Sequence, residues 1–173
     1  GKEIKCIQYK GEGWGITSDG ERLYMSDGSA AIRIVNEETF ATEGIINVTL
    51  DGMSLDLINE LEWVDGSIWA NIYLADLIVE IDPKSGDVLG YIDLSPLRTL
   101  LKDNPEAEAL NGIAYNTEVN LIYKHLTLKA VKGDYSLNIR SSFRYLENGI
   151  KDCSGCLRPH RRENYGAIME KMG

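Results

Sequence analysis

Two cysteines and a histidine near the end of this 173-residue chain have a spacing that could bind a metal ion. Cys153, Cys156 and His160 form the pattern C-x2-C-x3-H, which offers two thiolates and one imidazole to zinc. His125 is the only other histidine and would have to serve as a distant fourth ligand. The two cysteines could instead form a redox pair, or the segment could be an unstructured end of the chain. A lone C-x2-C pair decides nothing, so we assign no metal and no cofactor.

The residues before this segment have the pattern of an all-β fold, with few helical signals. Short alternating or β-branched runs are separated by Gly-containing turns at intervals of roughly ten residues. The predicted strands are Arg22 to Ser26, Ala31 to Asn36, Ile45 to Leu50, Glu62 to Val64, Ser67 to Tyr73, Leu77 to Asp82 and Val88 to Asp93. Asp-Gly pairs at Asp19, Asp27, Asp51 and Asp65 predict hairpin turns. The only predicted helix is Ser95 to Asn104.

An internal repeat indicates how these strands are grouped. The turn at Asp19-Gly20 and the turn at Asp65-Gly66 are 46 residues apart, and Asn36 aligns with Asp82 at the same offset. A third copy begins at Leu110 and breaks off after Tyr123. A period of 40 to 50 residues that carries several short strands is typical of β-propeller blades. We therefore predict about two and a half blades of an incomplete propeller; a β-meander or sandwich is the alternative.

The charge of the chain changes sign near Tyr123. The whole chain has a net charge of -9, but residues 1 to 123 have a net charge of -14 and residues 124 to 173 have +5. The acidic total argues against a general affinity for nucleic acid or anionic lipid, and no apolar run is long enough to span a membrane. We predict two parts: a β domain over residues 1–123 and a basic tail over residues 124–173, for which a frame-shifted reading and a disordered segment are the two interpretations.

Four ordered motifs resemble one enzyme family. GEGWGITSDGERLYMSDGS (11–29), LINELEWVDGSIWANIY (57–73), IVEIDPKSGDVLGYIDL (78–94) and LNGIAYN (110–116) are similar to segments of the plant and bacterial type of glutaminyl cyclase, the glutamine cyclotransferase family. The resemblance covers roughly residues 9 to 123. It implies a five-bladed propeller in the complete family fold and an enzyme that acts without a metal.

The activity that the resemblance implies is cyclisation of an N-terminal glutamine to pyroglutamate, with release of ammonia. The α-amine attacks the γ-carboxamide of the same residue, so a carboxylate must manage the amine proton and hydrogen bonds must stabilise the amide oxygen. Aromatic walls must bend the glutamine and exclude water. The implied partners are peptides or proteins with a free N-terminal glutamine.

The motifs carry five candidate site residues. The resemblance implies that Trp14 is an aromatic wall and that Asn59 hydrogen-bonds the reacting glutamine. Tyr73 stands where the family typically has Trp and can still supply a ring face. Glu60 beside Asn59 is a second candidate for the catalytic group, and Asn111 is a candidate for substrate binding. Packing between blades is the alternative role for Trp14, and satisfying backbone groups at the propeller centre is the alternative role for Asn59.

Two family features have no counterpart in the sequence. The Tyr-Glu-Ser-Thr-Gly type motif, whose Glu is thought to be the general acid/base, is absent, and so is the Val-Thr-Gly-Lys-x-Trp-Pro type strand after LNGIAYN. The first residues, GKEIKCIQYK, include no initiator Met and no signal peptide, so we expect upstream sequence. We therefore expect a truncated and inactive form of the enzyme. Relatives are commonly exported, but the compartment of this chain stays open.

Two other functions remain possible on sequence alone. The first is a noncatalytic propeller-like module in which Trp14 and Tyr73 hold a peptide. The second is an adaptor whose basic, Cys-containing tail binds a metal or an acidic partner, with the β part as a scaffold.

Overall fold

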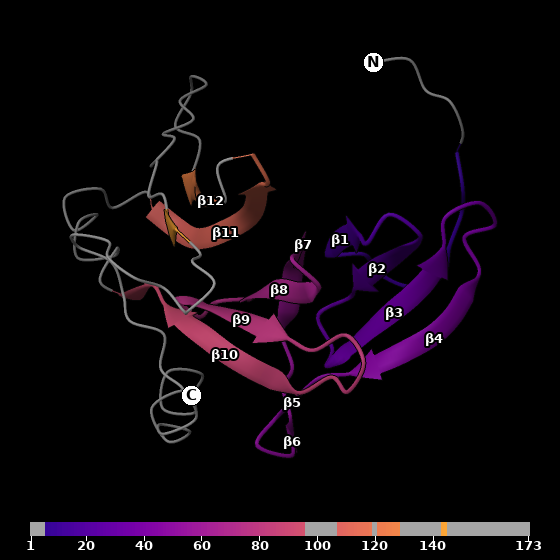
Figure 1. The fold of residues 1–173 in the computed structure, drawn as a ribbon, viewed down its shortest axis with the longest axis horizontal. Coiled ribbons are helices and arrows are strands. Elements are labelled where there is room, and N and C mark those ends of the chain that lie inside the picture. Colours follow the sequence, from indigo (N-terminus) through magenta and orange to yellow (C-terminus); the bar gives the residue numbers. More distant parts are fainter. Residues whose placement is uncertain (1–5, 96–106, 119–120, 129–142, 145–173) are drawn as a thin grey trace.

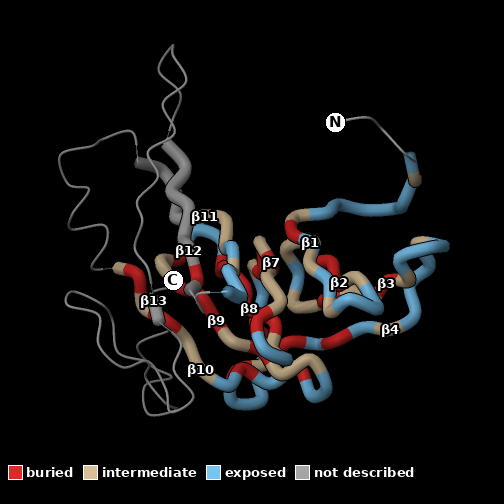
Figure 2. Tube along the Cα trace, turned by 45° about the horizontal axis from the view of Figure 1, so that its top comes forward, coloured by how far each residue is buried: buried red, intermediate tan, exposed pale blue. Residues whose placement is uncertain are grey.

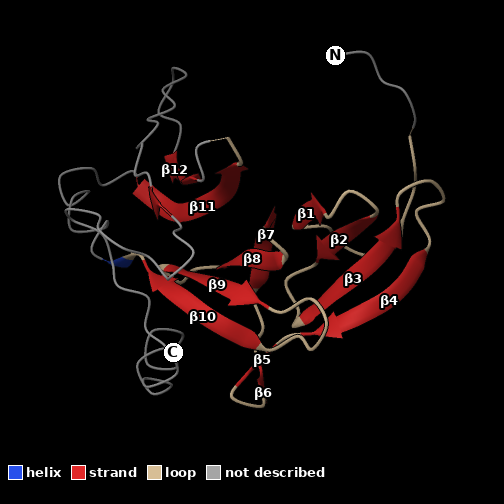
Figure 3. Cartoon of the chain, viewed as in Figure 1, coloured by secondary structure: helices blue, strands red, loops and turns tan. Residues whose placement is uncertain are grey.

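The computed structural model describes residues 6–95, 107–118, 121–128 and 143–144, which form strands and the turns and loops between them (Figure 3). The first sheet contains β1 (Gly15–Ser18), β2 (Arg22–Ser26), β3 (Ala31–Asn36) and β4 (Thr42–Asn47); the second contains β7 (Ile58–Val64), β8 (Ser67–Ile72), β9 (Leu77–Ile81) and β10 (Val88–Asp93). The third contains β11 (Ala107–Asn116), β12 (Leu121–Leu128) and β13 (Phe143–Arg144), and β5 (Thr49–Leu50) pairs with β6 (Met53–Ser54). No helix in this described part of the chain is long and apolar enough to cross a bilayer.

Each of the first two sheets is an antiparallel meander in which neighbours in sequence are neighbours in space. The Asp19-Gly20 turn joins β1 to β2 and the Asp65-Gly66 turn joins β7 to β8, so the 46-residue repeat corresponds to one sheet, as predicted. Figure 1 shows the sheets fanning outward from a centre where their first strands, β1, β7 and β11, come together. This arrangement brings three segments that are distant in sequence to one place.

The main core lies between the facing surfaces of the first two sheets. It is formed by buried side chains such as Ile32 and Ile46 from the first sheet and Leu61, Ile68 and Val79 from the second. Figure 2 shows the buried positions along the strands and the exposed ones mainly at the turns. Removing apolar surface from water at about 25 cal/mol per Å² is the main force that holds such sheets face to face.

Two polar contacts between first strands complement this apolar core. The Trp63 N–H of β7 donates to Thr17 Oγ1 of β1 at 2.8 Å, and the Tyr115 N–H of β11 donates to Glu62 Oε1 of β7 at 2.7 Å. Burial raises the pKa of Glu62, and the hydrogen bond from Tyr115 opposes this shift. β1 and β7 therefore each use a side chain to accept a hydrogen bond from a backbone N–H of the next first strand.

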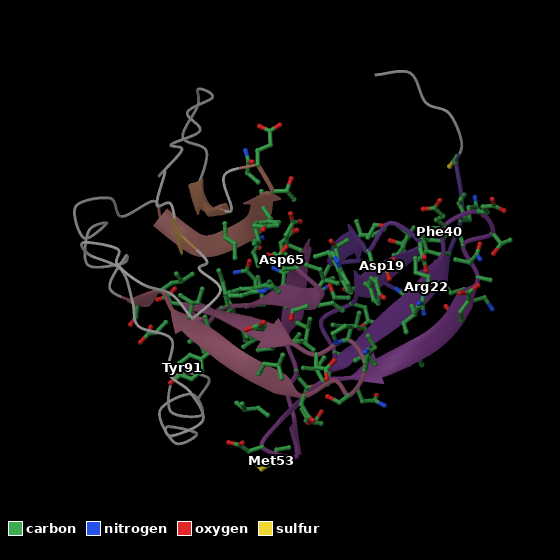
Figure 4. The ribbon with its side chains drawn as sticks, in the orientation of Figure 1. Asp19, Arg22, Phe40, Met53, Asp65 and Tyr91 are labelled. Atoms are coloured by element: carbon green, nitrogen blue, oxygen red, sulfur yellow. The ribbon has the colours of Figure 1, made fainter. Side chains whose placement is uncertain are left out.

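The Asp-Gly pairs are turn formers, as predicted. Asp19 accepts hydrogen bonds from the backbone N–H groups of Glu21 and Arg22 and from the Tyr24 hydroxyl. Burial raises the Asp19 pKa, but these hydrogen bonds and the Arg22 charge outweigh it, so the pKa is lowered overall. Figure 4 shows Asp19 and Asp65 near the centre of the fan; Asp65 accepts the Tyr115 hydroxyl at 3.0 Å.

Strand bounds match the predictions at β2, β3 and β10, and β8 and β9 each end one residue earlier than predicted. β1 was not predicted, and two predicted runs differ more widely. The run predicted as Ile45 to Leu50 is split, because β4 ends at Asn47 and Val48 turns fully into the core before β5 begins. β7 begins at Ile58 and not at Glu62, since a bulge between Ile58 and Leu61 interrupts the alternation that the sequence analysis relied on. Of the helix predicted from Ser95 to Asn104, residues 96–104 lie outside the described residues.

Candidate functional site

The candidate site lies where β1 and β7 begin, beside the irregularity in the middle of β11. Gly15 opens β1 against the backbone of β7, where an added Cβ would overlap the carbonyl oxygen of Asn59. β8 runs antiparallel to β7 and ends beside its start, where Ile58 pairs with Ile72. Tyr73 directly follows β8, so it emerges at the same end as Asn59. The fold thus collects Trp14, Asn59 and Tyr73 from two sheets, and Asn111 joins them from the third.

Two of these strands carry an irregularity at the same place. The β7 register shifts between Ile58 and Leu61, and the β11 register shifts between Asn111 and Ile113. Asn59 and Asn111 occupy the corresponding position in the two strands, just before the extra residue. Bulges re-aim side chains and are common next to active sites. Here they set two amides apart from the regular alternation of the strands.

Asn59 is the most constrained of the predicted site residues. It is 8% exposed, and its Nδ2 donates to Asn111 Oδ1 at 3.0 Å. Its backbone carbonyl accepts the hydroxyl of the fully buried Ser26 at 2.5 Å. The residue is therefore fixed by β2 on one side and by β11 on the other.

Trp14 is held by its backbone and by both ends of its ring. Its N–H donates to the Ser26 carbonyl at 3.0 Å, and its indole Nε1 donates to Glu12 Oε2 at 2.7 Å. The six-membered part of the indole lies over Gly28, where an added Cβ would come within 2.6 Å of the ring. Gly28 has φ +86°, a conformation that glycine adopts without strain. The absence of a side chain at Gly28 thus allows the indole to pack directly on the backbone.

Tyr73 forms the second half of an aromatic pair with Trp14. The ring centroids are 5.3 Å apart and the planes meet at 69°, an edge-to-face arrangement. Tyr73 remains 40% exposed, so one side of the pair is open to solvent. The Tyr73 N–H donates to the Leu57 carbonyl, and the Leu57 N–H donates to the Gly28 carbonyl. Leu57 has φ +65°, in the left-handed region. Its two hydrogen bonds connect the backbone of Gly28, under the Trp14 ring, to the backbone of Tyr73.

Glu60 is the predicted residue that the structure connects least to the others. It lies half-buried in the bulge of β7. Within the described part of the chain, no hydrogen bond links its carboxylate to Trp14, Asn59 or Tyr73. The carboxylate that does contact one of the two aromatic rings is that of Glu12, on the exposed segment before β1, which accepts the Trp14 indole N–H.

Ser26, Gly28 and Leu57 contact the candidate site residues, but the sequence did not mark them as part of a site. Each acts through a contact with a distant segment, and such contacts leave no local pattern. Gly28 had one available signal, because it lies inside the SDGS stretch of a matched motif.

Cys153, Cys156 and His160 lie outside the described residues. Residues 6–95, 107–118, 121–128 and 143–144 contain no group of three His, Cys, Asp or Glu side chains that could hold a metal ion.

Comparisons with known proteins agree with this arrangement of motifs. The profile of the family described as glutamine cyclotransferase matches residues 2–130. A glutaminyl-peptide cyclotransferase of Arabidopsis thaliana is 35% identical over 114 residues, which are 65% of this chain and 36% of the relative. The crystal structure of Myxococcus xanthus glutaminyl cyclase superposes with a TM-score of 0.68 at 38% identity, over 72% of this chain and 55% of that one. The chain thus spans about a third of the curated relative and about half of the solved structure.

Proposed function

This chain belongs to the glutamine cyclotransferase family, and from that premise we propose that it supplies the glutamine-binding part of a glutaminyl-peptide cyclotransferase. Its sheets are blades of a β-propeller, which the Myxococcus relative supports through its likeness over 55% of its length. The proposed domain covers residues 1–123 and the proposed basic tail residues 124–173. β12 runs across this boundary to Leu128, so the first residues of the tail pair with β11. The substrates are peptides and proteins with a free N-terminal glutamine.

The observation that carries the proposal is the convergence of an aromatic pair and an amide pair at one end of the first strands. Trp14 and Tyr73 provide two ring faces at 69°, and Asn59 near the start of β7 is hydrogen-bonded to Asn111 in the middle of β11. Aromatic faces suit the methylene chain of glutamine, and amides suit its carboxamide. A pocket for this substrate requires both.

The reaction forms one bond and breaks one bond. The α-nitrogen of glutamine bonds to its own side-chain carbonyl carbon, the bond from that carbon to the carboxamide nitrogen breaks, and the amine proton leaves with that nitrogen as ammonia. Trp14 and Tyr73 hold the glutamine side chain folded toward its own amine, so that the α-nitrogen is positioned to attack the side-chain carbonyl carbon. Asn59 binds the carboxamide, and Glu60 at the rim attracts the substrate's ammonium group.

Binding and turnover can be measured separately. We expect saturable binding of Gln-Phe amide by calorimetry, with ammonia release at background for this chain alone, because its sequence contains no match to the Tyr-Glu-Ser-Thr-Gly type motif. Acetyl-Gln-Phe amide, which lacks the free amine, and Ala-Phe amide serve as comparison peptides. Equal binding of Gln-Phe and Ala-Phe amides would favour a general peptide-binding module. Turnover comparable to that of an intact cyclase would contradict the expectation of inactivity.

A further inference from the structure

The amide of Asn59 has only one orientation that agrees with its neighbours. Asn111 Oδ1 accepts the backbone N–H of Gly112 at 3.0 Å, and a backbone N–H can only donate. The Asn111 atom at this position must therefore be the oxygen. The same oxygen faces Asn59 at 3.0 Å, so the Asn59 atom that meets it must be the Nδ2 donor. The assignment follows from hydrogen-bond chemistry and not from the appearance of the side chains.

In this orientation the side-chain oxygen of Asn59, Oδ1, points away from Asn111. We propose that Asn111 is a positioning residue that presents Asn59 Oδ1 as a hydrogen-bond acceptor, and so makes the site select an N-terminal glutamine over an N-terminal glutamate. The inference rests on the proposed function, because it concerns the substrate of that site. A glutamine carboxamide offers N–H donors to an acceptor, whereas the glutamate carboxylate offers none and is repelled by it.

The surrounding structure makes this arrangement rigid. The Ser26 hydroxyl of the first sheet donates a hydrogen bond to the backbone carbonyl of Asn59, and Gly15 packs closely against the same stretch of backbone. Asn59 is 8% exposed, so its side chain has little room to rotate. The bulge at Gly112, with φ +73°, places the Gly112 N–H where Asn111 Oδ1 can accept it. The Asn111 amide is thereby fixed by its own strand before it meets Asn59.

A site built around a directed acceptor discriminates strongly against a ligand that lacks the matching donor, by 10⁴ or more in favourable cases known for other enzymes. We expect a smaller ratio here, on the order of 10-fold to 100-fold between Gln-Phe amide and Glu-Phe amide, because the site is partly open to solvent.

Two substitutions of Asn111 separate positioning from folding. Asn111→Leu keeps the approximate size but removes the acceptor, so the Asn59 amide is free to reverse. Asn111→Asp keeps an acceptor for both Asn59 Nδ2 and the Gly112 N–H. Asn116→Leu is the matched control: Asn116 ends the same strand, and its side chain accepts the Glu118 N–H in a turn away from Asn59.

The experiment measures the affinity of the full chain and the three variants for both peptides by calorimetry, with thermal unfolding recorded for each. We expect Asn111→Leu to lower the preference for Gln-Phe amide by about 10-fold. Asn111→Asp and Asn116→Leu should retain it within about 3-fold. Signals of the Asn59 side-chain amide in a ¹⁵N-labelled sample should show a hydrogen-bonded N–H in the wild type and in Asn111→Asp only.

The outcomes distinguish the two proposals. A wild type that binds neither peptide would overturn both. Equal binding of both peptides by the wild type would overturn the selectivity inference and leave glutamine binding standing. A folded Asn111→Leu with unchanged preference would also overturn the inference. If Asn111→Leu does not fold, Asn111→Asp decides: loss of the preference in that variant contradicts the role given to the acceptor.

Discussion

The ring of Trp14 meets the ring of Tyr73 edge to face across two different sheets, with centroids 5.3 Å apart. Trp14 directly precedes β1 and Tyr73 directly follows β8, so the contact depends on the packing of the first sheet against the second. Gly28 packs under the Trp14 ring, and the Leu57 carbonyl accepts the Tyr73 N–H. The pair therefore reports on both the fold and the proposed site.

Replacing Tyr73 tests whether its ring is a wall of the pocket. Tyr73→Ala should weaken binding of Gln-Phe amide by about 10-fold, since an aromatic pair contributes about 0.5 to 1.5 kcal/mol beyond its buried area. Tyr73→Trp restores the residue typical of the family and should bind at least as well as the wild type. Leu89→Ala, at an exposed apolar position on β10, is the control in the calorimetric titration. Unchanged affinity of Tyr73→Ala would exclude the ring from the pocket.

The packing of the Trp14 indole on Gly28 can be tested by replacing two glycines with alanine. Gly28→Ala and Gly20→Ala both place Ala at a positive φ, which costs about 1 to 2 kcal/mol, but Gly20 has open space around it. At Gly28 the new methyl group also collides with the Trp14 ring, and overpacking adds about 1 to 3 kcal/mol. Urea unfolding should therefore show a larger loss for Gly28→Ala, together with a change in Trp14 fluorescence. Equal losses would mean that the indole does not rest on Gly28.

The contact between the first strands of two sheets can be removed with one isosteric change. Thr17→Val deletes the acceptor for the Trp63 N–H, and we expect the free energy of unfolding to fall by about 1 to 3 kcal/mol. Thr42→Val, at an exposed position on β4, should change it by less than about 0.5 kcal/mol. If urea unfolding gives the same free-energy change for Thr17→Val and Thr42→Val, the hydrogen bond from the Trp63 N–H contributes little to stability.

Two carboxylates make stability depend on pH. Burial raises the pKa of Glu62 and of Glu80 above 4.5, although hydrogen bonds from the Tyr115 N–H and the Ser67 hydroxyl oppose the shift. A raised pKa in the folded state gives a stabilising contribution that is present below pH 4.5 and is lost as the pH rises through the folded-state pKa.

The corresponding variants are Glu62→Gln and Glu80→Gln, which keep an acceptor oxygen. Relative to the wild type, each should gain stability as the pH rises from below 4.5 toward neutral. Unfolding curves at a series of pH values check this, and a constant difference between variant and wild type would contradict the burial of these groups.

Much of the fold could be predicted because its signals are local. The Asp-Gly turns and the alternating runs between them fix β2, β3 and β10, and the 46-residue offset groups the strands into sheets. The beginning of β7 was missed because its bulge breaks the alternation at Asn59 and Glu60. The split after Asn47 was missed because Val48 continues an apolar run in the sequence while its backbone turns into the core.

The site was predictable only in part, for the same reason. Trp14, Asn59, Tyr73 and Asn111 stand in motifs that a family resemblance can carry, and the structure brings Trp14 to Tyr73 and Asn59 to Asn111. The contacts of Ser26 and Leu57 join segments that are distant in sequence, so no local pattern signals them. The boundary at Tyr123 and the role of the tail stay predictions.

The most direct test of glutamine binding uses the three indole N–H signals of the chain. Trp14 lies in the proposed pocket, whereas Trp63 stacks on Tyr24 between the first two sheets and Trp69 is buried in β8. A ¹H–¹⁵N spectrum is recorded during titration with Gln-Phe amide, and Trp→Phe variants assign the signals. We predict that the Trp14 signal shifts with saturation while those of Trp63 and Trp69 stay in place. No shift of the Trp14 signal at saturating peptide, or an equal shift of all three signals, would contradict the proposed site.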